Sequence, residues 1–492
     1  MHEYEIGQMK IERKSYLDQL VSRKWNGMIK VVAGMRRSGK SYLLFRLFVE
    51  HLQESGVDEE HIVRIELDRK ENARYRSSDA LYDLIKSKIS GRGKYYVLID
   101  EIQLAGDDFY EVLNSLLHYD NVDTYVTGSN SRFLVTDIVT EFRGRSDTIM
   151  LWPLSFDEWM SVGRQNWRDG WTDYFTFGGL PKVREAKTPE ERIAYLRQVF
   201  AKTYLSDVVE RNRIRNVDDL NDIVAVLASG IGSLTNVQKI ADTFKTVKGK
   251  SISKNTVARY IAALENAFLI QKARRYNVKG RKYIGAQVKY YFTDVGIRNC
   301  ILGFRQQEES HIMENVIYNE LRRRGWEVDV GVVETWDKSR TGSRFRNPLE
   351  IDFVCNKGSA RYYIQSAFMV PDREKMAQEQ RPFSNVPDSF RRVMIVKDAA
   401  SPWYNEQGTL IVGLNDFLFD ASILERTPAD SRPASPQRPA VTNRNAEIFD
   451  RIMLLDSHGR LRDGSVSPRL SKKGVPKIVE VYSLENDKTD VT

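Results

Sequence analysis

The sequence predicts an α/β protein whose first part is built on a parallel sheet. Short apolar strands are expected at residues 28–33, 61–67, 95–100, 123–128 and 148–151. Helical patterns separate them, at about residues 40–54, 78–90 and 108–119, after an amphipathic helix at 10–25. Apolar strands that alternate with helices are typical of a parallel sheet covered on both faces. A glycine-rich loop between the first strand and the next helix also fits this fold class.

That loop has the pattern G-x-x-x-x-G-K-S, from Gly34 to Ser41. Between a strand and a helix N-terminus, such a loop points backbone N–H groups at one site, and the helix dipole adds positive charge there. Lys40 can reach the β- and γ-phosphates of ATP, and the Ser41 hydroxyl can ligate Mg²⁺. We therefore predict that ATP is bound by Gly34, Arg37, Ser38, Gly39, Lys40, Ser41 and Tyr42. The alternative is a glycine-rich turn followed by a chance Lys-Ser pair.

Two carboxylates end the strand at residues 95–100. Asp100 is the last residue of this apolar run and Glu101 follows it. We expect Asp100 to hold Mg²⁺ together with Ser41, and Glu101 to act as the general base for an attacking water. Catalytic side chains of an open α/β sheet gather at the carboxyl ends of its strands, where both motifs are expected. The alternative is an acidic turn at the end of a strand.

Composition limits the class of protein. The chain has 492 residues, of which 29% are charged, and its mean hydropathy is −0.47. We find no apolar run long enough to cross a membrane, and residues 1–5 lack the basic-then-apolar pattern of a signal peptide. The two cysteines, Cys300 and Cys355, form no C-x-x-C pair, so neither structural zinc nor a disulfide framework is expected. These features predict a cytoplasmic protein.

Positive charge is concentrated in residues 230–290. The whole chain carries a formal charge of +8, and this segment holds thirteen lysines and arginines but only two acids, Asp242 and Glu265. A basic block inside an otherwise nearly neutral chain indicates a polyanionic partner, which we expect to be DNA. The alternative is a solvated basic face.

The same segment has the pattern of a winged helix. Helices are expected near residues 235–244 and 253–267, and strands at 269–276 and 289–293. Ser253 is a good N-cap, so the residues after it would lead a recognition helix into the major groove. The residues expected to contact DNA are Lys254, Asn255 and Arg259 in that helix, and Arg281 and Lys282 at the wing tip. The alternative is a winged helix that only packs against a neighbouring domain.

Taken together, these motifs resemble a group of prokaryotic AAA-type ATPases, in which an ATPase core precedes a C-terminal domain of unknown function. The resemblance covers about residues 10–420. It rests on residues 34–41 and 98–103, Val126-Thr127-Gly128-Ser129-Asn130-Ser131, Arg143-Gly144-Arg145, Pro153-Leu154-Ser155-Phe156 and Tyr174-Phe175-Thr176-Phe177-Gly178-Gly179-Leu180-Pro181. It implies that Asn130 or Ser129 senses the γ-phosphate. It also implies that Arg145 or Arg143 is an arginine finger, and a finger acting between subunits would require a homo-oligomer. The alternative for these arginines is a surface ion pair.

The C-terminal segment resembles the PD-(D/E)XK nuclease fold. The resemblance implies that Glu314 is the helix acid and Asp352 the first strand acid. The second strand should read E-x-K or Q-x-K, but here it reads Gln365-Ser366-Ala367. This change removes the cation that would activate water, unless Lys375 on the next helix replaces it. We therefore expect a degenerate nuclease site, formed by Glu314, Asp352 and Gln365, without nuclease activity.

The expected fold class is a P-loop NTPase parallel sheet with a helical lid, a winged helix and an α/β nuclease-like C-terminal domain. The expected parts are an ATPase core at 1–154, a lid at 155–228, the winged helix at 229–298, the nuclease-like domain at 299–420 and a Pro/Ser-rich linker with a weakly ordered tail at 421–492. Three functions fit this plan: an Mg-ATP hydrolase that controls a DNA-binding winged helix, an ATP-gated nuclease-like effector, and an ATP-dependent protein-binding switch. The first is our main hypothesis.

Overall fold

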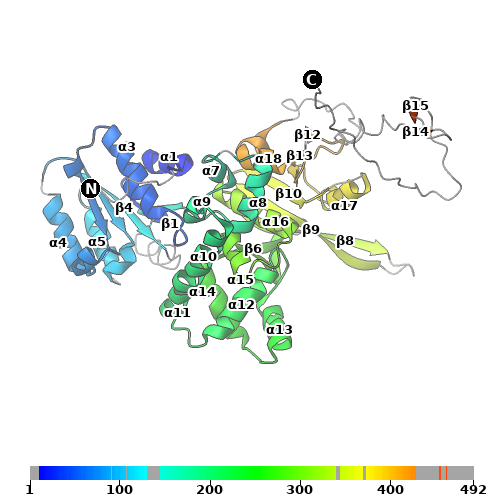
Figure 1. The fold of residues 1–492 in the computed structure, drawn as a ribbon, viewed down its shortest axis with the longest axis horizontal. Coiled ribbons are helices and arrows are strands. Elements are labelled where there is room, and N and C mark those ends of the chain that lie inside the picture. Colours follow the sequence, from blue (N-terminus) through cyan, green and yellow to red (C-terminus); the bar gives the residue numbers. More distant parts are fainter. Residues whose placement is uncertain are drawn as a thin grey trace, which may run out of the picture. The chain divides into compact units, whose positions relative to one another are not determined.

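The computed structural model describes residues 10–89, 91–106, 108–129, 144–163, 165–338, 344–369, 373–399 and 401–427, and the pairs 454–455 and 461–462. The chain divides into two compact units, Met1–Pro433 and Ala434–Thr492. In the second unit, β14 (Leu454–Leu455) and β15 (Leu461–Arg462) form a two-stranded antiparallel sheet. The rest of the expected linker and tail from residue 428 onward lies outside the described residues. The first unit holds two sheets and the helices around them (Figure 1).

The parallel sheet predicted for the first part of the chain is present. Its strand order is β2-β3-β4-β1-β5, and each neighbouring pair is parallel. The strands are β1 (Ile29–Ala33), β2 (Ile62–Glu66), β3 (Tyr95–Asp100), β4 (Val122–Gly128) and β5 (Ser146–Met150). The glycine-rich loop and the acid pair therefore follow β1 and β3, at the same edge of the sheet.

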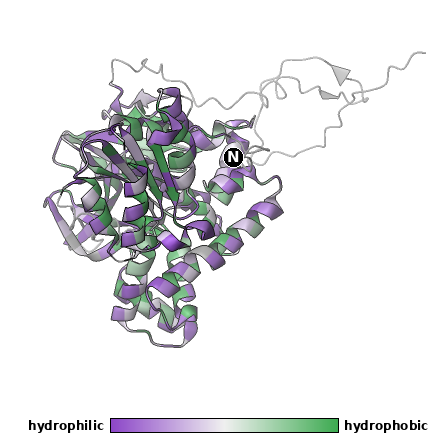
Figure 2. Ribbon diagram, turned by 90° about the vertical axis from the view of Figure 1, so that its left-hand side faces the viewer, coloured by the Kyte–Doolittle hydropathy of each residue, from purple (hydrophilic) through white to green (hydrophobic). Residues whose placement is uncertain are grey.

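Helices cover both faces of this sheet, as its apolar strands require. On one face, Val32, Leu98 and Tyr125 pack with α1 and with the helix that follows the glycine-rich loop. On the other face, Val31, Ile99 and Val126 share a core with later helices. Figure 2 shows hydrophobic strands enclosed by helices that also carry hydrophilic residues. The helices of this part are α1 (Lys14–Ser22), α2 (Lys40–Tyr42), the π-helical segment η1 (Leu43–Phe48), α3 (Val49–Glu54), α4 (Ser78–Lys88) and α5 (Phe109–Leu116), with 3-10 turns η2 (Glu59–His61), η3 (Lys70–Tyr75) and η4 (Ile102–Ala105).

A helical region follows the sheet, and sequence-encoded caps define its elements. Ser155 and Thr188 each form a capping box with the glutamate three residues later, and Asn166 and Asn216 cap two further helices. The helices are α7 (Phe156–Met160), α8 (Trp167–Phe177), α9 (Pro181–Glu185), α10 (Pro189–Val199), the π-helical η6 (Phe200–Leu205), α11 (Ser206–Arg211) and α12 (Val217–Ser229).

Two more helices and a hairpin occupy the basic segment. Asn236 caps α13 (Val237–Lys248), and Ser253 caps α14 (Lys254–Asn266) by accepting a hydrogen bond from Thr256 N. The antiparallel hairpin consists of β6 (Ile270–Asn277) and β7 (Lys282–Phe292). Thr235 pairs with Val288 of β7 in an isolated bridge, which holds the start of α13 against the hairpin.

This hairpin is also the edge of the second sheet. The order is β12-β13-β11-β10-β9-β8-β6-β7, and β6 runs parallel to β8. The expected boundary at residue 298 therefore falls between two segments that share one sheet. The further strands are β8 (Glu327–Lys338), β9 (Arg344–Lys357), β10 (Ala360–Ala367), β11 (Arg391–Val396), β12 (Trp403–Tyr404) and β13 (Leu410–Gly413). β8 and β9 are longer than the strands expected at 327–333 and 350–355.

Helices α15 (Val295–Ile301), α16 (Glu309–Arg323), α17 (Arg373–Ser384) and α18 (Leu414–Phe419), with the 3-10 turn η7 (Ile423–Glu425), complete the first unit. Ile312, Val316 and Leu321 of α16 share a core with buried residues of the mixed sheet, such as Phe353 and Ile364. The described residues contain no helix that is both long and apolar enough to span a membrane.

Candidate nucleotide site and associated clusters

The glycine-rich loop is held tightly against the sheet. A Cβ on Gly34 would lie 2.1 Å from the carbonyl oxygen of Leu151, so no side chain fits there. Gly39 has φ of +98°, in the region that favours glycine, and Arg37 also has positive φ. The Lys40 side chain is 4% exposed, and Nζ donates to the carbonyl oxygens of Gly34 and Met35 at 3.1 Å each. The loop therefore wraps around the ammonium group of Lys40.

Asp100 lies beside the Ser41 hydroxyl, as the sequence predicts for a shared cation site. Ser41 Oγ donates to Asp100 Oδ2 at 2.7 Å, and Thr127 Oγ1 donates to Asp100 Oδ1. Burial raises the pKa of Asp100 to about 6, against the opposing effect of these two hydrogen bonds. No pattern in the sequence gives Thr127 a role beyond its place in the fourth-strand motif.

Glu101 adopts a left-handed conformation, with φ of +49°, that turns the chain after β3. Its carboxylate lies 3.9 Å from Lys40 Nζ, and it accepts hydrogen bonds from Gln103 and, at 3.0 Å, from Ser129 Oγ. Burial alone would raise the pKa of Glu101, but Lys40, Gln103 and Arg36 together outweigh it and lower the pKa. An ionised carboxylate beside a lysine and a serine hydroxyl has the charge state that a general base needs.

The donor set fits a magnesium-bound nucleoside triphosphate. Ser41 and Asp100 offer adjacent oxygen atoms, which are the ligands that Mg²⁺ prefers. Ser38 Oγ is fully buried in the loop and has no hydrogen-bond partner among the described residues. Tyr42 is half-buried beside the core on the α1 side of the sheet.

The helical region contacts the glycine-rich loop directly. Tyr204 Oη donates to the carbonyl oxygen of Arg36 at 2.6 Å, and Arg36 Nε lies 2.7 Å from Asp207 Oδ2 on α11. A small cavity beside these groups is lined by residues of the glycine-rich loop, the end of β4, η6, α11 and the carboxyl end of α14: Arg36, Ser129, Tyr204, Asp207, Val208, Arg211, Asn212, Ala263, Asn266 and Ala267. The glycine-rich loop therefore packs directly against η6 and α11.

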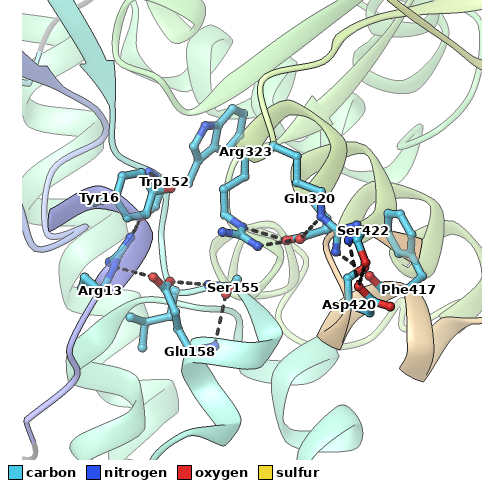
Figure 3. Close-up of polar contacts among 12 residues, drawn as sticks. Arg13, Tyr16, Trp152, Ser155, Glu158, Glu320, Arg323, Phe417, Asp420 and Ser422 are labelled. Carbon is cyan, nitrogen blue, oxygen red and sulfur yellow. Dashed lines mark hydrogen bonds and ion pairs between the residues drawn. The ribbon is translucent and has the colours of Figure 1, made fainter. Parts of the chain in front are cut away.

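Arg13 is a buried arginine that sequence analysis missed, because no pattern marks it. Its guanidinium donates to the carbonyl oxygens of Ser38, at 3.1 Å, and Trp152, at 2.6 Å. It also lies 3.0 Å from Glu158, the residue that completes the capping box of α7 (Figure 3). Arg323 of α16 lies in the same region, paired with the buried Glu320 (Figure 3). Arg13 therefore ties the glycine-rich loop to the beginning of the helical region.

Comparison with known proteins places this loop in a family. Residues 26–160 match an AAA domain, and residues 168–308 match a domain of unknown function, DUF8612. An uncharacterized protein of Haemophilus influenzae is 31% identical over 391 residues, which cover 78% of this chain and 93% of that protein. The chain belongs to the family of this Haemophilus protein. Residues 26–160 of the chain, which contain the first sheet, form an AAA domain of the P-loop class, and this class implies ATP binding.

More distant similarities are also present. The uncharacterized protein MJ1544 of Methanocaldococcus jannaschii is 27% identical over 316 residues, 61% of this chain and 67% of that protein. Among solved structures, C. elegans PCH-2 has a TM-score of 0.24 at 15% identity, covering 52% of this chain and 67% of that one. A DNA replication initiation factor has a TM-score of 0.24 at 13% identity, covering 53% and 90%.

The expected arginine finger lies far from the AAA domain's own nucleotide loop. Arg145 precedes β5, and its carbonyl oxygen accepts a hydrogen bond from Ile29 N at the start of β1. The loop follows the other end of β1, so the strand separates the two. Arg145 therefore cannot reach a nucleotide in the same chain. Asn130 and Arg143 lie outside the described residues.

The residues expected to contact DNA are exposed. Lys254, Asn255 and Arg259 lie in the first turns of α14, and Arg281 and Lys282 lie at the β6–β7 turn. Part of the positive charge of residues 230–290 is compensated in the folded protein, because acids from outside this segment pair with some of its lysines. Lys248 lies 2.7 Å from Asp222, and Lys250 lies 3.0 Å from Asp219, both on α12.

The predicted nuclease-like acids do come together, but around a lysine. Lys289 of β7 is 2% exposed, and its Nζ lies 2.9 Å from Glu314, 2.7 Å from Glu350 and 3.9 Å from Asp352. Gln365 Oε1 accepts a hydrogen bond from Asp352 N at 3.2 Å. Lys375, the expected substitute, pairs with Glu379 of its own helix. One feature of the sequence indicates this cluster, which is the presence of a lysine within the apolar run at 288–292.

The positive charge of Lys289 and the negative charges of the acids around it stabilise each other. Burial would lower the pKa of Lys289, but Glu314, Asp352 and Glu350 outweigh it and raise the pKa. Burial and Glu314 raise the pKa of Asp352 to about 8. The ammonium group thus supplies the positive charge that a divalent cation would bring to such acids. The described residues contain no group of three or more His, Cys, Asp or Glu side chains able to hold a metal.

Proposed function

We propose that the protein hydrolyses Mg-ATP and that its nucleotide state controls a DNA-binding surface on α14 and the β6–β7 hairpin. The observation that carries this proposal is the convergence of Lys40, Ser41, Asp100 and Glu101 at one edge of the parallel sheet. No other cluster among the described residues combines a buried lysine, an oxygen pair for a cation and an ionised carboxylate next to a phosphate-binding loop.

Each residue has a distinct task in this proposal. Lys40 and the loop N–H groups bind the phosphates, while Ser41 and Asp100 hold Mg²⁺, which when bound offsets charge on the phosphate oxygens. Glu101 accepts the proton of the attacking water, and Ser129 orients the Glu101 carboxylate. Asn130 is the proposed γ-phosphate sensor. Arg145 acts only on a nucleotide held by a neighbouring subunit, so this assignment requires an oligomer.

The coupling route is the contact between the glycine-rich loop and α11. Arg36 moves with the loop, and its pairing with Asp207 links the loop to the cavity beside the carboxyl end of α14. A change in the loop alters the packing of α11 and therefore of α14, whose amino end carries Lys254, Asn255 and Arg259.

The test is ATP hydrolysis with and without duplex DNA, across a salt series, for the wild type, Lys40→Ala and Glu101→Gln. We expect Lys40→Ala to lose nucleotide affinity. We expect Glu101→Gln to bind ATP but turn over about 10²- to 10⁴-fold more slowly. Stimulation by DNA should fade steeply as salt rises, because phosphate contacts release counterions. Normal turnover by Glu101→Gln would overturn the assignment of the base.

An ATP-dependent protein-binding switch is the second candidate. The pairing of Lys248 and Lys250 with α12 acids favours it, because these lysines are already neutralised within the protein. It predicts ATP turnover that is indifferent to DNA at every salt concentration. The nuclease-like alternative is disfavoured by Lys289, whose ammonium group already neutralises the acids.

A further inference from the structure

Strands β8 and β9 extend beyond the sheet as a two-stranded ribbon (Figure 1). The neighbouring strand β6 pairs with β8 only as far as Asn277 and Val332, and Lys279 Nζ then reaches the carbonyl oxygen of Glu334 at 2.8 Å. Past that point the two strands pair only with each other, through Thr335↔Asn347, Trp336↔Arg346, Asp337↔Phe345 and Lys338↔Arg344. Among the described residues, β6 pairs only with Val330 to Val332 of β8, so this later part of β8 has β9 as its neighbouring strand.

The two faces of the ribbon differ. Side chains alternate along a strand, and residues directly opposite each other share a face. Asp337 is on the face that helix α17 covers, where Arg381 donates to both of its carboxylate oxygens at 2.8 and 2.9 Å. Trp336, Arg344 and Arg346 belong to the opposite face, which we call the open face.

The open face combines an exposed aromatic ring with positive charge. Trp336 is 67% exposed, although tryptophan is normally among the largely buried residues. Arg344 is exposed as well, and the Arg346 side chain remains 56% exposed while pairing with Glu334. The β6–β7 turn beside the ribbon adds exposed Lys279, Arg281 and Lys282.

We propose that the open face of the β8–β9 ribbon binds single-stranded nucleic acid, with an unpaired base stacked on Trp336 and phosphates on Arg344 and Arg346. Stacking platforms flanked by basic residues bind unpaired bases of any sequence, because every base has a π-face. In a duplex the base faces are already stacked on one another, so an exposed indole has no partner there. The site is separate from α14, and its binding requires no ATP hydrolysis.

The experiment is fluorescence anisotropy of labelled oligo-dT and oligo-rU of about 15 nucleotides, and of a duplex, with the full chain and no nucleotide. We expect Trp336→Ala to weaken binding of single strands by about tenfold and to leave duplex binding unchanged. Trp336→Phe, which keeps a stacking ring, should recover most of the affinity. The dT and rU probes distinguish DNA from RNA as the source of the strand.

The arginines are tested by salt dependence. Arg344→Gln with Arg346→Gln should reduce the slope of log affinity against log salt by about 1.4, which corresponds to two lost phosphate contacts at ~0.7 each. Arg168→Gln removes an exposed arginine of α8 and serves as the matched control. The proposal is overturned if the wild type does not bind the single strands, if Trp336→Ala binds them normally, or if it weakens duplex binding equally. If the double variant Lys254→Gln and Arg259→Gln loses binding, that result bears on the α14 surface and not on the ribbon. The two proposals can therefore fail independently of each other.

Discussion

Asp207 Oδ2 lies 2.7 Å from Arg36 Nε, which joins helix α11 to the glycine-rich loop of the AAA domain. The same arginine also lies 3.4 Å from Ser129 Oγ, and Ser129 in turn donates to Glu101. One chain of polar contacts therefore runs from α11 to the proposed general base. Arg36, Asp207 and Glu101 are only partly buried, so a nucleotide or a solvent change can alter their contacts, whereas Ser129 between them is buried.

Asp207→Asn should uncouple ATP turnover from DNA. The substitution keeps the size of the side chain but removes the charge that holds Arg36, so α11 loses its ionic contact with the loop. We expect basal hydrolysis to change by less than about threefold and stimulation by duplex DNA to fall to near the basal rate. Steady-state ATPase assays with increasing duplex measure both. Asp218→Asn, an exposed acid on α12, is the control, and equal DNA stimulation in Asp207→Asn and wild type would contradict this route.

Thr127→Val should raise the Mg²⁺ concentration needed for activity. Thr127 Oγ1 donates to the Asp100 carboxylate and accepts from Glu101 N at 2.9 Å, so it orients the proposed metal ligand and fixes the backbone that carries the proposed base. Loss of a group that supports a metal ligand typically costs 10- to 100-fold in metal affinity or activity. A magnesium titration of ATP hydrolysis measures the effect, and Thr172→Val, on the helical surface of α8, is the matched control. An unchanged titration curve would mean that Thr127 only supports the fold.

The AAA domain could be predicted closely because its signals are local. The run from Lys30 to Ser41 contains strand, loop and helix start in twelve consecutive residues, and the strands that carry the two motifs, β1 and β3, are apolar over most of their length. Short connections leave few alternatives for such a pattern. The observed strands β1 to β5 differ from the expected ones by at most two residues at either end.

The contacts of the buried Arg13 and Lys289 could not be predicted, because they join segments that are distant in the sequence. Arg13 contacts Trp152, which is 139 residues away in the sequence, and Lys289 of β7 contacts Glu314 of α16 and Glu350 of β9. Arg13 has no local pattern that marks it as buried, and the apolar run around Lys289 does not indicate which acids it contacts. The extension of β8 and β9 was missed because the few apolar residues of 334–338 and 344–349 are divided between the two faces, Trp336 on one and Phe345 and Leu349 on the other, which removes the alternation that marks a strand.

Gly296→Ala should destabilise the first unit severely. A Cβ on Gly296 would lie 1.9 Å from the carbonyl oxygen of Phe177, next to the Gly178-Gly179 turn. The neighbouring Asp294 accepts hydrogen bonds from Gly179 N at 2.7 Å and from Ile297 N at 2.9 Å, so this contact also positions the cap of α15. We expect a loss of more than about 3 kcal/mol in unfolding free energy. Thermal denaturation measures it.

Gly56→Ala is the control for that experiment. Gly56 has φ of +84° and open space around its Cβ position, so it tests the backbone cost alone, about 1–2 kcal/mol. Equal losses in the two variants would show that the contact with Phe177 is unimportant.

Lys289→Met should destabilise the mixed sheet strongly near neutral pH. The substitution keeps the length of the side chain but leaves the carboxylates of Glu314 and Glu350 without their ammonium partner. Removing one member of a buried ion cluster typically costs about 3–5 kcal/mol. Urea denaturation at several pH values measures it, with Lys375→Met, a half-exposed surface lysine, as the control. The loss should shrink as the pH falls, because protonated acids need no counter-charge.

Asp352→Asn tests the same cluster through its pH dependence. The pKa of Asp352 is about 8 in the folded protein against 3.8 for an ordinary aspartate, so between these values the folded state holds a proton that the unfolded state has lost. Stability therefore falls as pH rises through this window, by up to about 1.4 kcal/mol per pH unit from this group. Asp352→Asn carries no titrating proton, so the slope of unfolding free energy against pH should flatten. An unchanged slope would mean that Asp352 is already ionised beside Lys289.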